Sequence, residues 1–407
     1  MKRTNDLRKN FMWNLIGLSF YGFISLFLLI IVKRVNGLDI SGIFSYAYSI
    51  CTLFFYISLY YSRTYQIANY DNNKSFNQFI SARVLSVILS LFLILMFCFV
   101  SKFDTFRIIV IMLLMLFRSV DAISDTFYGY LQEHEKLYQV GISYTLKSVI
   151  GTFLFLVVDL ITNNICLSIG ALLFVNVVFF YLYDYYNFKK LYKDRILFDI
   201  SNIKLIAKEA FPIFIFTFLA IFLSNAQKYV LVYISSNELQ SIFAMIIMPA
   251  TVLSLIGNYL INPFINKLNL FFKNGEIKEF NSLSMKIVLS LFLIGIVGVF
   301  VCYFIGIPIL NIIYSINLDQ YRICLTIIIF ASILNALSMI FSSLLIILNR
   351  NNIQTLFYLI SSIIAVFVCL FISDNVIVAA TLSYLISYSF NIIVYYLYYC
   401  YVVKKLK

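Results

Sequence analysis

Residues 106–131 read FRIIVIMLLMLFRSVDAISDTFYGYL, an apolar stretch that nevertheless carries charged side chains in its second half. A membrane-spanning α-helix needs about 20 mostly apolar residues, so this stretch is long enough to cross a bilayer. Arg118, Asp121 and Asp125 recur at steps of three and four residues, which places them on one helical face. Because charge is costly inside a bilayer, such a face is expected to turn toward the protein interior or a water-filled cavity.

The composition of the whole chain agrees with this interpretation. Of its 407 residues, 62% are hydrophobic and only 12% are charged, whereas soluble domains have roughly 45–50% and about 25%. A soluble enzyme is therefore excluded, and the sequence predicts an all-α polytopic membrane protein. Twelve runs are predicted to span the membrane: 11–32, 42–62, 80–100, 106–131, 139–161, 164–187, 211–234, 240–262, 285–310, 321–348, 353–372 and 375–402.

The distribution of basic residues predicts the orientation of these spans. With both termini in the cytoplasm, 23 Lys and Arg residues fall on the cytoplasmic side and 5 on the other face. Cytoplasmic loops of membrane proteins carry such an excess, which also explains the net charge of +12 without a nucleic-acid partner. The longest polar connection, Lys189–Lys208, divides the spans into two sets of six. We therefore expect an N-terminal lobe with a cytoplasmic linker over 1–199 and a C-terminal lobe over 200–407, around a central cavity.

The sequence contains none of the short motifs that mark common catalytic sites. It has no phosphate-binding loop, no dinucleotide-binding glycine pattern and no HExxH. The single histidine, His134, lies in a predicted loop, where a solvated side chain is the simplest interpretation. We expect no enzyme activity, no metal and no cofactor.

Polar residues at helical spacing inside several spans suggest one shared cavity. Ser, Thr and Asn often serve only for hydrogen bonds between helices, and basic residues near span ends can reach the interface. The Arg118–Asp121 pair could likewise be purely structural. The candidates for contact with a bound solute are Arg63, Arg118, Lys147, Lys228, Tyr48, Tyr56 and Asn225, and those for ion coupling are Asp121 and Asp125. A cavity with this excess of basic side chains favours an anionic solute, especially a phosphate group.

Several short segments resemble Wzx-type polysaccharide flippases, which belong with the MATE-like exporters to the MOP superfamily. The similarity covers the N-terminal half and the start of the second half of the chain. The matching segments are KRVNG (33–37), SGIFS (41–45), RTYQI (63–67), FISAR (79–83), RSVDAISD (118–125), YGYLQ (128–132), NAQKY (225–229), MPA (248–250) and NP (262–263).

The resemblance implies a fold and an activity. The fold would be twelve helices in two six-helix lobes around a V-shaped cavity in the bacterial cytoplasmic membrane. The activity would be flipping a polyprenyl-diphosphate-linked oligosaccharide between leaflets for O-antigen or capsule assembly. Membrane lipids, coupling to protons or sodium, and a polysaccharide polymerase partner would accompany it. A MATE-type drug or cation antiporter, and a membrane-embedded polymerase or acyltransferase, are the alternatives.

Overall fold

The computed structural model describes residues 2–69, 74–261, 264–350 and 353–406. Within these ranges the chain consists of helices and short connections, and they contain no β-strand. Nine of the described helical segments are long and apolar enough to cross a membrane. The prediction of an all-α, multi-pass membrane protein is therefore confirmed.

The chain divides into two compact units, Met1–Phe218 and Leu219–Lys407. The division falls within one long helix, α8 (Ile203–Ile234). The lobe boundary at 199/200 stays a prediction.

The first unit begins with α1 (Lys2–Ser58), in which two helices meet at a kink at Gly37. Gly37 has φ 85°, a conformation that a residue without a Cβ adopts at little cost. The kink separates the first two predicted spans. The other elements of this unit are α2 (Arg63–Asn69), α3 (Phe76–Val100), α4 (Thr105–Glu133), α5 (Leu137–Thr162), α6 (Ile165–Phe179), the π-helical η1 (Phe180–Tyr185) and α7 (Tyr186–Leu191), followed by the first part of α8.

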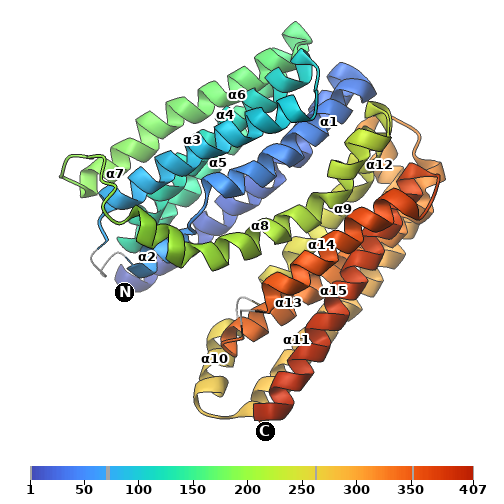
Figure 1. The fold of residues 1–407 in the computed structure, drawn as a ribbon. Helices are drawn as coiled ribbons and strands as arrows, with labels where there is room; N and C mark the ends of the chain where they lie inside the picture. Colours follow the sequence, from blue (N-terminus) through green and yellow to red (C-terminus); the bar gives the residue numbers. More distant parts are fainter. Residues whose placement is uncertain (1, 70–73, 262–263, 351–352, 407) are drawn as a thin grey trace. The chain divides into compact units, whose positions relative to one another are not determined.

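The second unit contains the rest of α8 and the elements that follow it (Figure 1). These are α9 (Asn237–Ile261), α10 (Ile265–Lys273), α11 (Ile277–Val301), η3 (Cys302–Gly306), α12 (Ile307–Tyr314), η4 (Asp319–Tyr321), α13 (Arg322–Ile347), α14 (Gln354–Phe371) and α15 (Val376–Leu406). The run α11–η3–α12 is continuous and covers one predicted span. With α1 taken as two helices and with α4 and α9 included, the described helices fit the twelve predicted spans.

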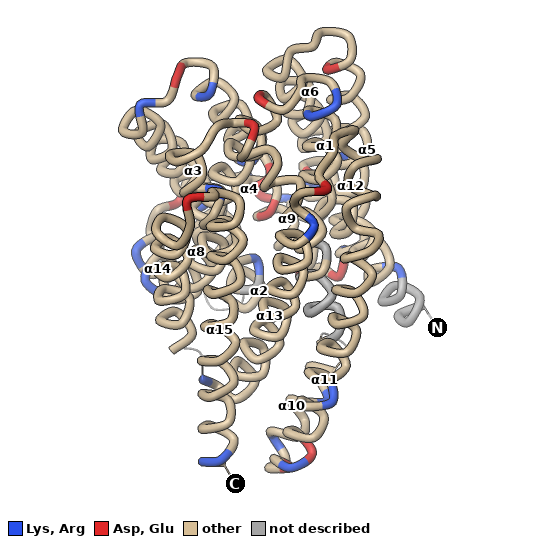
Figure 2. Tube along the Cα trace, turned by 90° about the vertical axis from the view of Figure 1, so that its right-hand side faces the viewer, with Lys and Arg blue, Asp and Glu red and all other residues tan. Residues whose placement is uncertain are grey.

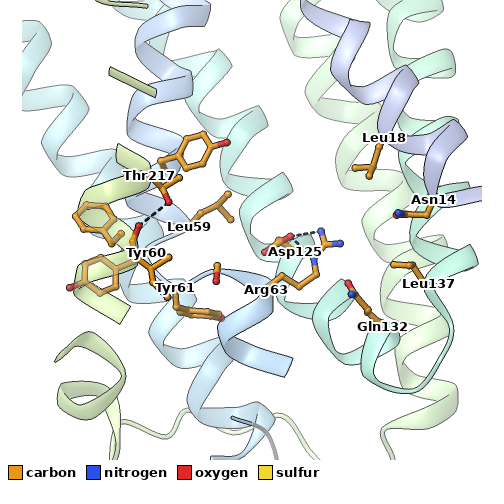
Figure 3. Close-up of a pocket in the computed structure, with 14 residues that line it drawn as sticks. Asn14, Leu18, Leu59, Tyr60, Tyr61, Arg63, Asp125, Gln132, Leu137 and Thr217 are labelled. Carbon is orange, nitrogen blue, oxygen red and sulfur yellow. Dashed lines mark hydrogen bonds and ion pairs between the residues drawn. The ribbon is translucent and has the colours of Figure 1, made fainter. Parts of the chain in front are cut away.

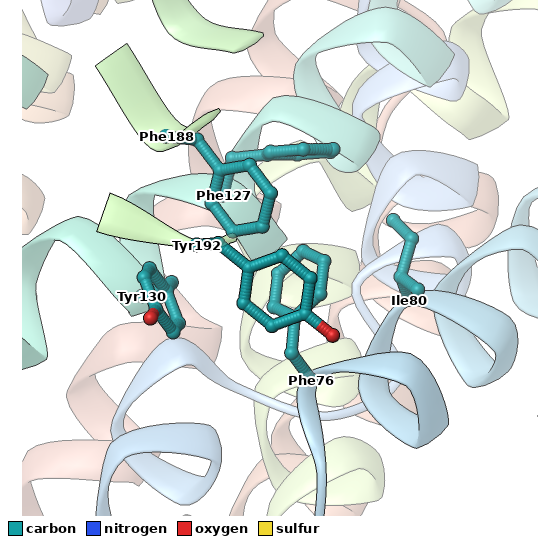
Figure 4. Close-up of a cluster of buried hydrophobic side chains, with 6 residues drawn as sticks. All are labelled: Phe76, Ile80, Phe127, Tyr130, Phe188 and Tyr192. Atoms are coloured by element: carbon teal, nitrogen blue, oxygen red, sulfur yellow. The ribbon is translucent and has the colours of Figure 1, made fainter. Parts of the chain in front are cut away.

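Helix α4 occupies a central place in the first unit, in contact with α1, α2, α3, α5 and α6. At the end of α4 that is predicted to face the cytoplasm, a cluster of aromatic side chains packs α4 against α3 and α7 (Figure 4). The rings of Phe76 and Phe188 lie 4.5 Å apart, and Phe127 packs edge-on against Phe188 at 4.8 Å. This packing fixes the position of the α4 face that carries the charged residues.

Helices α1 and α5 approach each other closely at two glycines. A Cβ added at Gly141 would lie 2.1 Å from the Trp13 carbonyl oxygen, and one added at Gly17 would lie 2.3 Å from the Gly141 carbonyl oxygen. Both obstacles are backbone atoms, which cannot move aside as a flexible side chain can. The contact between these two helices therefore depends on the absence of side chains at Gly17 and Gly141.

We predict that Gly141→Ala destabilises the protein, because the added methyl group forces α1 and α5 apart. Over-packing of this kind costs about 1–3 kcal/mol or more. Gly170→Ala is the matched control, because a Cβ at Gly170 meets nothing within 4 Å. Thermal unfolding in detergent, followed by size-exclusion chromatography, should show a lower midpoint for Gly141→Ala alone. Equal midpoints for the two variants would contradict the close contact.

Candidate functional site

A cavity of about 420 Å³ opens in the first unit beside the end of α1 and the polar face of α4 (Figure 3). Its wall combines aromatic rings, hydroxyl groups and one ion pair, and it includes the first part of α8. The lining residues are Asn14, Leu18, Tyr56, Leu59, Tyr60, Tyr61, Ser62, Arg63, Asp125, Gln132, Leu137, Ile213, Phe214 and Thr217.

Two arginines share one carboxylate at the wall of this cavity. Arg63 donates to Asp125 Oδ1 from Nε at 2.9 Å and also from Nη2. Arg83 Nη2 lies 3.3 Å from the other oxygen of the same carboxylate. The Arg83 side chain is fully buried, whereas that of Arg63 is 19% exposed. Asp125 therefore neutralises only one of the two charges, and Arg63 is the cation that borders the cavity.

Arg83 is held from several sides by neighbouring groups. It donates to the carbonyl oxygens of Ser58 at 2.8 Å and Tyr61 at 3.2 Å, and to the hydroxyl of Thr126 at 3.1 Å. These bonds fix the chain that connects α1 to α2. Because Arg63 is the first residue of α2 and follows this connection directly, Arg83 also fixes the position of the Arg63 backbone.

A second group surrounds Arg118, deeper in the bundle. Its guanidinium donates to the hydroxyls of Tyr21 at 2.7 Å and Tyr48 at 2.6 Å, and lies 3.5 Å from Asp121. The Tyr21 hydroxyl donates in turn to Asp121 at 2.9 Å, and Asn176 donates to the other oxygen of Asp121 at 2.8 Å. Arg118 is thus connected to α1 on one side and, through Asp121, to α6 on the other.

A third group joins α4, α5 and η1 around a buried lysine. Lys147 Nζ donates to Asp184 at 2.6 Å, to Ser124 at 2.9 Å and to Tyr128 at 3.1 Å. Asp184 also accepts from Ser143 at 2.6 Å. Asp184 lies in the π-helical η1, and such local widening of a helix often occurs where a side chain is aimed at a functional position.

The three groups together form what we call the charged cluster. It contains the cations of Arg63, Arg83, Arg118 and Lys147 and the carboxylates of Asp121, Asp125 and Asp184. Four positive and three negative groups leave one positive charge in excess. Each of the four cations contacts a carboxylate or a hydroxyl group. Asp125, which contacts both Arg63 and Arg83, is the carboxylate of the cluster that borders the cavity.

The predicted site residues fall into three places. Arg63, Tyr56 and Asp125 line the cavity. The remaining predicted residues of this unit, Arg118, Lys147, Tyr48 and Asp121, belong to the buried cluster behind it.

Asn225 and Lys228 lie on the part of α8 that belongs to the second unit. Asn225 donates to the Ile221 carbonyl oxygen at 3.3 Å and to the Ser224 hydroxyl at 3.0 Å. Lys228 is half-buried and forms no hydrogen bond or ion pair with the residues that the structure describes. The roles of all the predicted site residues stay predictions.

Two members of the charged cluster were not among the predicted site residues. Arg83 was counted only as a basic residue on the cytoplasmic side, although it lies inside the predicted span 80–100. Asp184 lies inside the predicted span 164–187. The available signal was the same for both, an ionisable residue within an apolar run.

Comparison with known proteins finds one relative in sequence and several solved structures with a similar fold. No family model matches the chain. The capsular polysaccharide biosynthesis protein CapF of Staphylococcus aureus is 24% identical over 404 residues, covering 96% of this chain and 98% of that protein. An inward-facing MATE-family multidrug transporter of the MOP superfamily superposes with a TM-score of 0.72 at 11% identity, covering 97% and 98% of the two chains. This chain has the MOP-superfamily fold.

The lipid II flippase MurJ, in an inward closed conformation, also shares the MOP fold. Its TM-score is 0.67 at 14% identity, over 94% of this chain and 87% of MurJ. The similarity to CapF and to the two MOP-superfamily structures confirms the resemblance suggested by the sequence segments.

The Lys147–Asp184 pair offers a direct test of the charged cluster. Removing one partner of a buried ion pair leaves an uncompensated charge and costs about 3–5 kcal/mol, whereas removing both can be nearly neutral. We therefore expect Lys147→Met and Asp184→Asn each to lower the unfolding midpoint, and the double variant to recover most of the loss.

Thermal unfolding of the four proteins in one detergent gives the coupling between the two sites. Lys193→Met is the control, because Lys193 is exposed and unpaired among the described residues. Additive losses in the double variant would show that the pair does not form.

Proposed function

We propose that this chain flips a polyprenyl-diphosphate-linked oligosaccharide from the inner to the outer leaflet of a bacterial cytoplasmic membrane. The product would enter the assembly of a surface polysaccharide such as a capsule or O-antigen. Three findings support this proposal: similarity to a capsule biosynthesis protein along the whole chain, the MOP fold, and a solved lipid II flippase among the structural neighbours. In this proposal the chain is a transporter and not an enzyme.

The observation that carries the proposal is the placement of Arg63 at the cavity. A diphosphate is a dianionic group that a guanidinium can bind through two parallel hydrogen bonds. Arg63 borders the cavity, and its carboxylate partner is already matched by Arg83. A bound diphosphate could thus replace Asp125 as the partner of Arg63 without leaving Asp125 uncompensated. The rings of Tyr56, Tyr60 and Tyr61 in the same wall would contact the sugar.

Transport requires that the substrate bind one conformational state better than the other. Exchange of Arg63 between Asp125 and the diphosphate supplies such a difference, because the exchange alters how the α1–α2 connection is held to α4. In this proposal Arg118 and Lys147 provide positive potential behind Arg63. Lys228 and Asn225, on the part of α8 that belongs to the second unit, stay proposed contacts for the diphosphate.

The orientation in the membrane is also proposed, with both termini in the cytoplasm. The distribution of charged residues between the two ends of the second unit supports this orientation. The bounds of the successive helices place Lys267, Lys273, Lys278, Lys286, Arg350, Lys404 and Lys405 with Glu276 and Glu279 at one end of that unit, and Glu238, Asp319 and Asp374 with Arg322 at the other. Figure 2 shows basic positions in blue at the C-terminal end of α15 and around α10. The basic end is expected to face the cytoplasm.

Replacement of Arg63 tests the headgroup contact. We expect Arg63→Ala to lower polysaccharide export about 10- to 100-fold, since hydrogen bonds to charged groups contribute about 1.5–3 kcal/mol. Arg63→Lys should recover part of the activity, because it keeps the charge but loses the two-point contact. Export can be measured by complementation in a strain that lacks its own flippase, with protein abundance checked by immunoblot.

The control variant is Arg195→Ala, which removes an exposed arginine outside the cavity. Full export by Arg63→Ala at normal abundance would show that this side chain is only structural. Efflux of cationic dyes without movement of lipid-linked glycan would instead identify a MATE-type antiporter.

An imposed proton or sodium gradient in the same export assay tests the proposed coupling role of Asp121 and Asp125. An active Asp121→Asn or Asp125→Asn variant whose export depends on the gradient as before would exclude that residue from coupling. Whether a polysaccharide polymerase takes part can be tested by co-purification.

The orientation predicts which engineered cysteines react from outside the cell. In a background without native cysteines, Ser236→Cys before α9 should be labelled by a membrane-impermeant maleimide. Asn274→Cys, between α10 and α11, should be labelled only after the cells are opened. Both positions are exposed, so accessibility within the protein does not differ between them. The opposite pattern would invert the proposed topology.

A further inference from the structure

A tight helical hairpin closes the basic end of the second unit. Helix α10 ends at Lys273, and α11 begins at Ile277. Gly275 turns the chain with φ 75°, and the Glu276 amide then donates to the Phe271 carbonyl oxygen at 2.9 Å. This glycine-dependent cap is a common way to end a helix. It folds the beginning of α11 back alongside α10, so that side chains of the two helices share one pocket.

The pocket has a volume of about 360 Å³ and a strongly basic wall. Three lysines line it, Lys267 from α10 with Lys278 and Lys286 from α11. All three are exposed, and none forms an ion pair with the residues that the structure describes. Its other lining residues are Phe271, Glu279, Ser282 and Leu283, so the wall carries three positive charges and one negative charge.

The spacing of these residues brings the lysines together. Lys278, Ser282 and Lys286 follow one another at steps of four, which places them on one face of α11. Lys267 lies four residues before Phe271, and its Nζ is 5.6 Å from the centre of that ring. The lysines therefore surround a hydroxyl and an aromatic ring, a set of groups that suits a phosphate with an apolar part attached.

The position of the hairpin favours an occupant from the membrane. Helix α10 follows the membrane-length α9 and precedes the apolar part of α11. It buries Leu268 completely, but Leu270 is 59% exposed and Phe264 is 37% exposed. A short helix with exposed apolar side chains and lysines is typical of a segment in the headgroup region of a bilayer.

We propose that the pocket between α10 and α11 binds the phosphate headgroup of an anionic phospholipid. The three lysines bind the phosphate, the Ser282 hydroxyl donates to it, and Phe271 and Leu283 contact the glycerol and upper acyl chain. Basic pockets of this kind on the cytoplasmic side of membrane proteins recognise anionic lipids. The pocket lies wholly within the second unit and does not include the charged cluster of the first.

The test uses the purified full-length protein in detergent with phosphatidylglycerol and phosphatidylcholine of identical acyl chains. Native mass spectrometry measures how much of each lipid remains bound. We expect the unmodified protein to prefer phosphatidylglycerol. The variant with Lys267→Gln, Lys278→Gln and Lys286→Gln together should lose this preference at least about ten-fold, and Lys278→Gln alone should lose about five-fold. Replacement of the same three lysines by arginine should preserve the preference.

A matched control removes the same charge from the same end of the unit, outside the pocket. It combines Arg350→Gln, Lys404→Gln and Lys405→Gln, three exposed cations that do not line the pocket. This variant should keep most of the preference. An equal loss in the control would show that attraction is diffuse, and an unchanged preference in the lysine variant would show that the pocket binds no lipid.

A further arm distinguishes a lipid from a soluble anion. Glycerol 1-phosphate presents the headgroup phosphate without acyl chains, and we expect it to displace phosphatidylglycerol only at concentrations at least about 100-fold higher. Displacement at equal concentration would overturn the assignment to a lipid. Because lipid binding is measured without transport, the outcome is independent of whether the chain flips an oligosaccharide.

Discussion

The free-energy cost of an unpaired charge in a membrane is the constraint on which the first unit depends. A charged group inside an apolar bundle must find an opposite charge or several hydrogen-bond donors or acceptors. Helix α4 carries three such residues, Arg118, Asp121 and Asp125, and its neighbours α1, α3 and α6 supply partners to them. Tyr21 and Tyr48 come from α1, Arg83 from α3 and Asn176 from α6. Assembly of the bundle around α4 and neutralisation of its charges are thus the same event.

This constraint also suggests why the proposed substrate site borders Asp125 rather than Arg118. A buried pair can exchange partners at low cost only if no charge is left alone during the exchange. Asp125 has two arginines, so one can turn to a new anion while the other remains. Asp121 has a single arginine, together with a tyrosine and an asparagine, and the removal of Arg118 would leave it without a cation. In the proposed binding, Asp125 can therefore both stabilise the fold and release one arginine to the substrate, whereas Asp121 cannot release Arg118.

The sequence was sufficient to predict the helices, because each apolar run is continuous and the membrane fixes its minimum length. It also predicted that Arg118, Asp121 and Asp125 share a face, since that depends only on the helical repeat. The partners could not be predicted, because they are distant in the chain: 62 residues separate Arg63 from Asp125, and 37 separate Lys147 from Asp184. Asp184 further depends on the π-helical turn of η1, which shifts the helical register and has no clear pattern in the sequence.

The two sets of basic residues differ in a way that follows from their surroundings. Every cation of the charged cluster has a carboxylate partner because its side chain is mostly buried in the bundle, where an isolated charge is costly. The lysines around α10 are exposed, so water stabilises them without any partner. A buried, paired cation can bind a new anion only by giving up the old one, which links binding to a change of structure. An exposed lysine binds a phosphate without such exchange, so the proposed lipid would stay bound during a conformational change of the protein. The proposed substrate would thus bind basic side chains that must change partners, which couples its binding to movement of the protein. The proposed lipid would bind basic side chains that have no partner to lose, which keeps it attached.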